Sequence, residues 1–348
     1  MTLTEFSYYL RRALPFIILF ALFFLIFFYA FKLFFLFLQI QKPKTVYSNP
    51  LFGKISKPII KNTTAGTGIS FKLDTIEGQP VTATDSAKVF FLPQATTRFG
   101  YREKAFLMAK TFGIDTEHAN YSLKDKEITI SDNIQKLSVD IINFNFRYQY
   151  FFDQDQHLFD NLAVPGTKES QDKAVDFLQS AGRYPDELAK GDINTIFFNY
   201  DPLTKTFKLL NNNVGANMAE VDFFRPSIDN FTVVSPRFPN SQNYVLMVFT
   251  PDGPRILRAQ INFFEKSEDQ VGTYPVKTGD TAYKELKSGK AIIISNPQRK
   301  TGVTIKKMFT AYFDPDSYQA YLQPIYVFIG EDSFVAFVPA VTGDYLTE

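Results

Sequence analysis

Histidine is the side chain best suited to act as a general base or a metal ligand near neutral pH. The chain of 348 residues contains two histidines, and the first, His118, lies in the segment DTEHAN. With Asp115 and Glu117 beside it, His118 could bind a metal ion or act as a base. An exposed residue at the end of a helix has the same surroundings, and we favour that interpretation.

The second histidine, His157, follows acidic residues at alternate positions, Asp153 and Asp155, as in the first half of a calcium-binding loop. Leu158 stands where such a loop needs glycine for its sharp turn, and no glutamate closes the pattern. The chain also has no cysteine, which excludes disulfides, thiolate zinc sites and cysteine nucleophiles. We therefore expect no catalytic residues, no cofactor and no metal site.

Other charged residues occur in pairs. Asp314 and Asp316 flank a proline, which is the composition of a turn, and they would act as acid and base only inside a cleft. The basic pairs at residues 299–300 and 306–307 fit solvated strand ends, or a surface for anionic lipid or polymer. With 37 basic and 36 acidic residues the net charge is +1, so we expect no nucleic-acid partner.

The chain carries one long apolar stretch, at residues 13–38. A helix needs about 20 apolar residues to cross the roughly 30 Å hydrocarbon core of a bilayer. A buried core helix is the alternative, but few globular helices are apolar on every side. We therefore predict a transmembrane anchor that contacts the lipid bilayer through residues such as Ala13, Phe20, Phe24, Phe31 and Leu38.

A cleaved signal peptide would have a shorter apolar region and a small-residue site after it. Here the stretch runs into the segment FLQIQKP, which has no such site. Arg11 and Arg12 suggest a twin-arginine signal, but their flanks and the strong hydrophobicity that follows do not fit one. We interpret residues 1–12 as a short head and residues 13–38 as an uncleaved anchor.

The segment after the anchor, residues 39–87, has several prolines and little apolar periodicity, which predicts an extended stalk. Folded structure is expected from residue 88. Helical periodicity ends at a glycine at residues 101–113 and 169–182, and a shorter helix is expected at 280–288.

Strand-like segments follow each of the three expected helices, and no rhythm of parallel strands with long crossovers is present. This order predicts an α+β fold with helices on one face of antiparallel sheets. The aromatic run at residues 144–152 reads as a core strand, or as an edge or groove for a partner. We divide the folded part into residues 88–225 and 226–348.

The last unit has the segments TAYxxLxxG from Thr281, TAYF from Thr310, QAYLQPIYVFxG from Gln319 and FVAFVPAV from Phe334. This pattern of a helix, a strand with a proline step and a final hairpin resembles the closing unit of PepSY-like domains. It also resembles the membrane-anchored extracytoplasmic regulators of the YycH and YycI type. The stalk segment NPLFGK is similar to uncharacterised anchored proteins of small-genome bacteria.

The resemblance covers about 65 residues and brings no catalytic residues with it. It implies a repeated PepSY-like fold and a non-enzymatic protein of the cell envelope that binds or restrains another envelope protein. It also implies that the folded part lies outside the plasma membrane, with residues 1–12 in the cytoplasm. An envelope hydrolase with carboxylates in a cleft and a structural scaffold remain alternatives.

The basic residues on either side of the anchor argue against placing the folded part outside the membrane. Five lysines follow the anchor and two arginines precede it, so the positive-inside rule alone would place the C-terminal side in the cytoplasm. Large domains are translocated largely regardless of charge, and the short head is too small to fold.

The closing hairpin, residues 325–339, is largely apolar on both faces, which an edge hairpin facing water could not sustain. One face should pack on the helix at residues 280–288, and the other should be covered by an earlier unit or by a partner. The candidate partner surface is therefore Tyr326, Phe328, Phe334 and Phe337.

Overall fold

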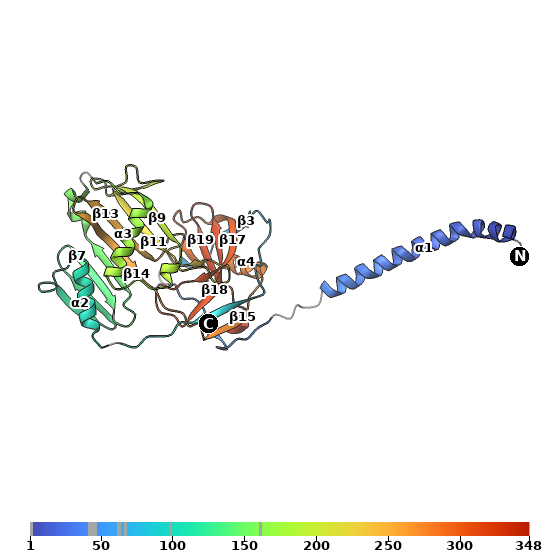
Figure 1. The fold of residues 1–348 in the computed structure, drawn as a ribbon, viewed down its shortest axis with the longest axis horizontal. Helices are drawn as coiled ribbons and strands as arrows, with labels where there is room; N and C mark the ends of the chain where they lie inside the picture. Colours follow the sequence, from blue (N-terminus) through green and yellow to red (C-terminus); the bar gives the residue numbers. More distant parts are fainter. Residues whose placement is uncertain are drawn as a thin grey trace. The chain divides into compact units, whose positions relative to one another are not determined.

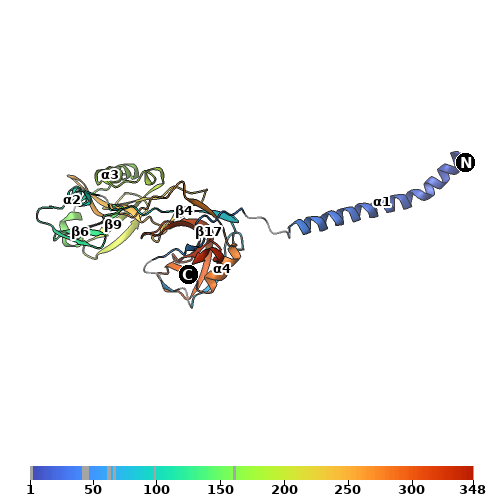
Figure 2. The same cartoon turned by 90° about the horizontal axis from the view of Figure 1, so that it is seen from below.

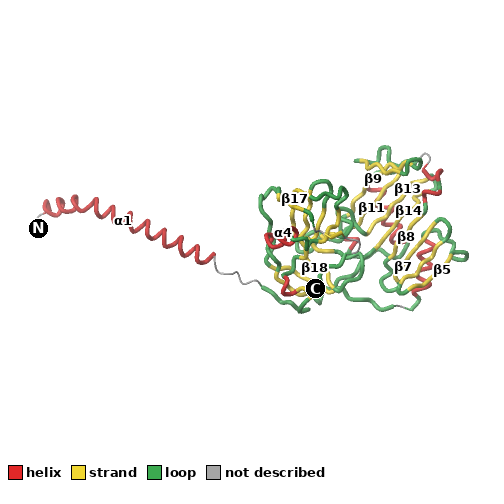
Figure 3. Tube along the Cα trace, turned by 180° about the vertical axis from the view of Figure 1, so that it is seen from behind, coloured by secondary structure: helices red, strands yellow, loops and turns green. Residues whose placement is uncertain are grey.

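The computed structural model describes residues 3–40, 47–60, 64–65, 68–97, 99–159 and 162–347. The chain forms two compact units, Met1–Val46 and Tyr47–Glu348 (Figure 1). The first unit is the helix α1, and the second is built mainly of strands and loops (Figure 3).

Helix α1 spans Leu3–Ile40, and its segment Ala13–Leu36 has a mean hydropathy of 2.7 with no part buried. Its length and composition suit a membrane span. Pro15 lies inside the helix. The predicted anchor residues Ala13, Phe20, Phe24 and Phe31 lie on it with exposed side chains; Leu38 also lies on it, but its side chain is outside the described part.

The second unit contains a nine-stranded sheet, in the order β10-β9-β11-β13-β14-β8-β7-β6-β5, in which every neighbouring pair is antiparallel. Its strands are β5 Asn120–Lys124, β6 Glu127–Ser131, β7 Gln135–Asp140, β8 Phe146–Tyr150, β9 Ile193–Asp201, β10 Thr206–Leu210, β11 Met218–Phe223, β13 Asn243–Thr250 and β14 Gly253–Ile261.

Two helices, α2 Tyr101–Thr111 and α3 Thr167–Ser180, pack on this sheet beside β6 and β9 (Figure 2). Each presents small and apolar residues one turn apart, Ala105 and Ala109 on α2 and Ala174 and Leu178 on α3. These side chains share one core with the strand residues Ile130, Leu137, Tyr148, Ala259, Val245 and Val221, which are cross-strand neighbours in that order. Both helices therefore cover the same face.

The second sheet has the order β12-β17-β18-β19-β16-β2, with β3 on β17 and β4 on both β15 and β18. Helix α4, Gly279–Lys287, packs Ala282 and Leu286 against it and begins at Thr278, whose hydroxyl accepts a bond from the Thr281 N–H. The strands are β2 Thr64–Ala65, β3 Ser70–Leu73, β4 Ser86–Phe91, β12 Val233–Val234, β15 Val271–Pro275, β16 Ile292–Ser295, β17 Gly302–Phe313, β18 Tyr321–Gly330 and β19 Val335–Pro339.

A two-stranded parallel sheet joins β1 Ile55–Ser56 to β20 Leu346–Thr347. The remaining elements are the 3-10 helices η1 Phe152–Gln154, η2 Gln156–Phe159, η3 Leu188–Lys190 and η4 Gly343–Tyr345.

The α+β class is confirmed, and each of the three expected helices is present. The order of a helix followed by antiparallel strands occurs three times: α2 precedes β5 to β8, α3 precedes β9 to β11, and α4 precedes β16 to β19. Helical periodicity and a glycine stop were sufficient to locate these helices because each buries one apolar stripe.

The segment expected to be an extended stalk, residues 39–87, behaves differently where the structure describes it. β1 pairs with β20, β3 with β17 and β2 with β16, so residues from Tyr47 onward belong to the folded unit. Ile55 is fully buried. The strands are two to four residues long, and such short pieces leave almost no periodicity in the sequence. The predicted division at residues 225 and 226 also differs from the sheets, because β13 and β14 join the nine-stranded sheet.

Candidate functional site

His118 forms no metal-binding group with the described residues around it. His118 is 83% exposed in its side chain, and its Nδ1 lies 2.7 Å from Asp115 Oδ2. This bond lowers the pKa of Asp115. His157 lies on η2, and its side chain is outside the described residues. Within the described ranges no three His, Cys, Asp or Glu side chains form a metal-binding group.

The predicted charged and aromatic segments are largely structural. Lys306 Nζ pairs with Asp74 Oδ2 at 2.6 Å and with Glu331 Oε1 at 3.1 Å, and Lys300 pairs with Asp332. The aromatic run forms β8, whose side chains alternate between buried and exposed. These residues therefore belong to ion pairs and to the core.

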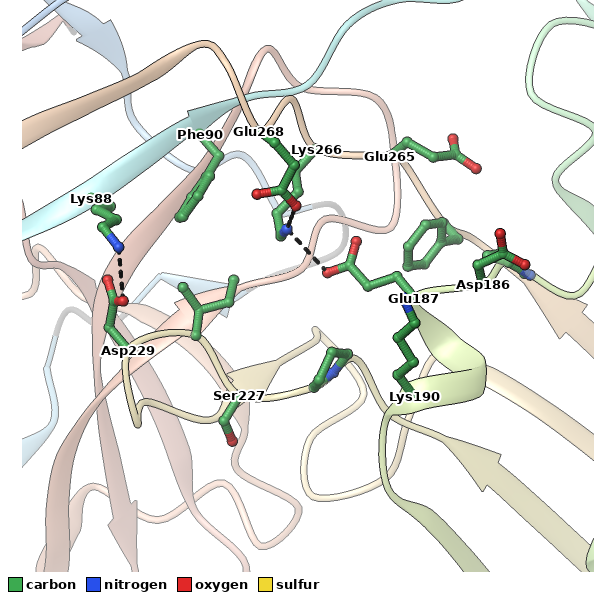
Figure 4. A pocket seen from close by; sticks show the side chains of 14 residues that line it. Lys88, Phe90, Asp186, Glu187, Lys190, Ser227, Asp229, Glu265, Lys266 and Glu268 are labelled. Atoms are coloured by element: carbon green, nitrogen blue, oxygen red, sulfur yellow. Dashed lines mark hydrogen bonds and ion pairs between the residues drawn. The ribbon is translucent and has the colours of Figure 1, made fainter.

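A charged cleft of about 580 Å³ opens where β4, η3 and residues 226–229 and 263–268 meet (Figure 4). Five carboxylates and three lysines line it with a few apolar side chains. The lining residues are Lys88, Phe90, Pro185, Asp186, Glu187, Lys190, Pro226, Ser227, Ile228, Asp229, Phe263, Glu265, Lys266 and Glu268.

Ion pairs occupy much of this cleft. Lys88 Nζ lies 2.9 Å from Asp229 Oδ1, and Lys266 Nζ pairs with Glu268 and lies 3.9 Å from Glu187 Oε1 (Figure 4). The other carboxylate oxygen of Glu187, Oε2, accepts a hydrogen bond from Nη1 of the buried Arg225 at 3.1 Å.

Arg225 lies beneath the cleft with 1% of its side chain exposed. Its Nη2 donates to Asp314 Oδ1 at 2.9 Å and to the carbonyl of Phe264 at 2.8 Å, and its guanidinium lies 3.9 Å from the Phe263 ring centroid. Burial raises the pKa of Asp314, and Arg225 opposes that rise. Asp314 follows β17 and Glu187 precedes η3, so Arg225 joins the two sheets by charge-assisted bonds.

A second carboxyl group with a raised pKa lies on β11. Burial, and then the neighbouring Glu220, raise the pKa of Asp222 to about 7. Neither Asp222 nor Asp314 lines the charged cleft. The two described carboxyl groups whose pKa is raised thus lie outside the cleft that would bind a substrate.

An apolar groove of about 650 Å³ lies along β12 and β17. Phe238 and Phe309 contact each other in its wall, with ring centroids 6.3 Å apart. Glu77 and Lys307 are the charged residues of its lining. The full set is Glu77, Val81, Ala83, Phe224, Asn230, Phe231, Thr232, Val233, Val234, Phe238, Lys307, Met308, Phe309, Thr310 and Ile329.

One edge of β17 is open in this groove. Its other edge pairs with β18 along nearly the whole strand. On the groove side, β3 pairs with residues 302–305 and β12 with residues 312–313. Among the described strands, none pairs with residues 306–311 on that side.

The backbone of β17 directs hydrogen-bonding groups to this open edge. The N–H groups of Tyr312 and Asp314 donate to β12 and its flank, at 2.9 and 2.8 Å. Alternate residues of a strand direct their backbone N–H and C=O groups to the same edge. The pairing with β18 is regular from Lys307 onward, so this alternation is not interrupted there. Met308 and Thr310 therefore present their N–H and C=O groups to the gap between β3 and β12.

The partner surface expected on the closing hairpin is corrected by the structure. Tyr326 and Phe328 are fully buried, and Phe334 and Phe337 are 1% exposed. Tyr326, Phe328 and Phe334 pack in the core that includes α4, whereas Phe337 packs with Val234 and other residues on the opposite side. The unit itself covers both faces, so none of the four side chains is available to a partner.

Sequence reasoning missed the groove because its walls come from segments far apart in the chain. Lys307 was considered only as part of a basic pair. The alternation of residues 303–313 identifies a strand, but which of its edges stays unpaired depends on where β3 and β12 end.

No protein-family model matches the chain, and no curated protein matches it. Two solved structures show a distant likeness, each at 12% sequence identity. An uncharacterized protein from Eubacterium rectale ATCC 33656 aligns over 79% of this chain and 90% of its own, with a TM-score of 0.36. The Bacillus megaterium YpeB C-terminal domain aligns over 72% and 96%, with a TM-score of 0.27. Scores this low do not establish a common fold. The described residues form a mixed α+β unit and a helix whose length and composition suit a membrane span.

Proposed function

We propose that this protein is a membrane-anchored, non-enzymatic binding protein of the cell envelope, which takes up an extended segment of another protein as an added strand on β17. The observation that supports this proposal is the open edge of β17 inside an apolar groove. Main-chain bonds to such an edge provide affinity, and the walls select side chains.

The dimensions of the gap suit an extended peptide. The unpaired stretch at residues 306–311 is close to the usual length of a strand. Met308 and Thr310 offer donors and acceptors that match a peptide backbone, which lipid chains and sugars do not reproduce. Phe238 and Phe309 favour a segment with apolar side chains on that face.

The anchor fits this function. A binding unit held at the membrane meets other envelope proteins at a raised local concentration. The threefold order of a helix and antiparallel strands agrees with the PepSY-like resemblance, which supports a regulatory protein whose folded unit lies outside the plasma membrane.

The hydrolase alternative would use the charged cleft. Catalysis by a pair of carboxyl groups needs one that keeps its proton near the working pH. The two carboxyl groups with a raised pKa, Asp222 and Asp314, lie outside that cleft. This separation favours the binding function over the hydrolase.

Site-specific photo-crosslinking in native membranes tests the proposal. A benzophenone amino acid at Lys307, which is exposed on the groove, should crosslink to a partner protein. The same substitution at Lys208, exposed on β10 of the other sheet, is the matched control.

A second pair of variants tests strand addition. Thr310→Pro removes an N–H from the open edge and should abolish the crosslink from position 307, because proline cannot donate to an added strand. Thr310→Val keeps that N–H, so the crosslink from position 307 should remain. Equal crosslinking at 208 and 307, or full crosslinking in Thr310→Pro, would overturn the proposal.

A further inference from the structure

The loop at residues 235–242 connects the groove to a buried charge cluster. It begins directly after β12, and its Phe238 forms part of the groove wall against Phe309. Its Arg237 faces the opposite way, toward two carboxylates of β11. One short loop therefore contacts both the binding edge and an ionisable pair.

The two carboxylates lie on one face of β11 because they are two residues apart on a strand. Arg237 Nη2 lies 2.7 Å from Glu220 Oε1, and its Nη1 lies 3.5 Å from Asp222 Oδ1. The side chains of Glu220 and Asp222 are 6% and 0% exposed. The Ser241 N–H donates to Asp222 Oδ2 at 3.2 Å, which fastens the far end of the loop to the same carboxylate.

The surrounding strands add little negative charge to this cluster. Tyr244 on β13 and Asn194 on β9 are the cross-strand neighbours of Asp222. The Arg237 guanidinium lies 4.0 Å from the Tyr244 ring centroid, and Arg258 and Arg147 act on the same tyrosine. The Arg237 side chain is 35% exposed, so part of its charge is shared with water.

We propose that this carboxylate pair controls the β17 groove through the loop at residues 235–242. The loop stays closed while one proton remains on the pair, and it opens when both groups are ionised. Opening moves Phe238 away from Phe309 and removes one wall of the groove. The effect on partner binding rests on the proposed function, whereas the loop motion itself requires no partner.

The direction follows from linkage. Burial and the charge of Glu220 raise the pKa of Asp222 to about 7, whereas an opened loop would expose this group to water and lower its pKa. The open state therefore releases the proton more readily, and raising the pH favours opening. For a pKa near 7 in the closed state, the opening constant should rise about tenfold between pH 6 and pH 8.

Hydrogen exchange of the full-length protein in detergent micelles measures this opening. After correction for the intrinsic effect of pH, protection of the Arg237, Phe238, Asn240 and Ser241 amides should fall about tenfold from pH 6 to pH 8. Protection of the β18 amides at residues 325–329 should stay constant. Asp222→Asn removes the ionisation and should make loop protection independent of pH, whereas Asp229→Asn, an exposed aspartate, should behave as wild type.

Glu220→Gln provides a second variant, should Asp222→Asn fold poorly. It removes the carboxylate that raises the pKa of Asp222, so the transition should move to lower pH. Loop protection that is equal at pH 6 and pH 8 in the wild type, or a pH response that persists in Asp222→Asn, would overturn the inference.

The crosslink from position 307 then links the loop to binding. Its yield should fall from pH 6 to pH 8 in the wild type and stay constant in Asp222→Asn. A crosslink that is missing at both pH values, together with the expected exchange result, would refute the proposed function and leave the loop mechanism standing. A yield insensitive to pH, despite loop opening, would refute the coupling to the groove.

Discussion

Asp222 shows how one buried carboxyl group ties folding to pH. Its pKa is raised in the folded chain, so the folded state holds a proton that the unfolded state releases. The contribution of Asp222 to stability is therefore highest at low pH and decreases as the pH rises from about 4 to about 7. We expect this group to lower the free energy of unfolding by on the order of 2–4 kcal/mol over that range.

Denaturant unfolding of the full-length protein in micelles at several pH values measures this loss. Asp222→Asn should reduce the dependence on pH between 4 and 7, because the variant has no proton to release at this position. A dependence that is unchanged in the variant would show that other groups cause it.

Arg225 gives a prediction of a different kind, because it is the cation shared by the buried Asp314 and the partly buried Glu187. Arg225→Ala would leave Asp314 buried without its partner, which typically costs about 3–5 kcal/mol. Lys88→Ala breaks the exposed pair with Asp229 and should cost about 0–1 kcal/mol. Similar unfolding free energies for the two variants would contradict the view that Arg225 joins the sheets.

The sequence alone does not predict the pairing of Arg225 with Asp314 or the burial of Asp222. Asp314 was predicted as a turn residue, and its partner Arg225 is 89 residues away in the chain. Asp222 alternates with apolar residues on β11, which normally indicates a solvent-facing side. Residues 235–242 return over that side, where Arg237 and Ser241 contact Asp222, and that packing leaves no local pattern.

At the scale of elements, the closing hairpin tests whether the unit covers both of its faces. Phe328 packs in the core with α4, and Phe337 packs on the opposite side. Phe328→Ala and Phe337→Ala should each lower the unfolding free energy by about 3–5 kcal/mol. Leu209→Ala, on β10 with 66% exposure, should stay within about 0.5 kcal/mol of wild type.

An effect near zero for either phenylalanine would mean that its face is open in solution. The measurement is denaturant unfolding of the three variants under the same conditions. The side chains on that face, among Tyr326, Phe328, Phe334 and Phe337, would then be available to a partner.

Elements with a strong period were predictable, and short ones were not. Three helices were located because each has an apolar stripe and a stop signal, and the hairpin at β18 and β19 because its strands are long and apolar. β1, β2 and β12 have two residues each, so their existence depends on neighbours rather than on their own sequence. The open edge of β17 depends on where the short strands β3 and β12 end, which is why the groove was not predicted.

For the whole molecule, the segment before β4 determines how a soluble fragment must be cut. A fragment beginning at Ser86 loses the pairing of β3 with β17 and the buried side chain of Ile55. A fragment beginning at Tyr47 retains both. We expect the Tyr47 fragment to have a melting temperature at least several degrees higher, because the loss of a buried Ile or Leu side chain alone typically costs about 2–5 kcal/mol. Equal melting temperatures would restore the view of this segment as a stalk.

The orientation of the chain in the membrane is the remaining prediction at this scale. We expect the unit from Tyr47 to Glu348 to face outside, since the short arginine-bearing head is an ordinary cytoplasmic start and large domains are translocated largely regardless of charge. Protease added to intact spheroplasts should therefore degrade this unit and leave a fragment protected by the membrane. A cytoplasmic marker protein that stays intact is the control. If the unit survives until the membrane is permeabilised, the lysines that follow the anchor determine its topology, and the partner of the β17 groove must be sought in the cytoplasm.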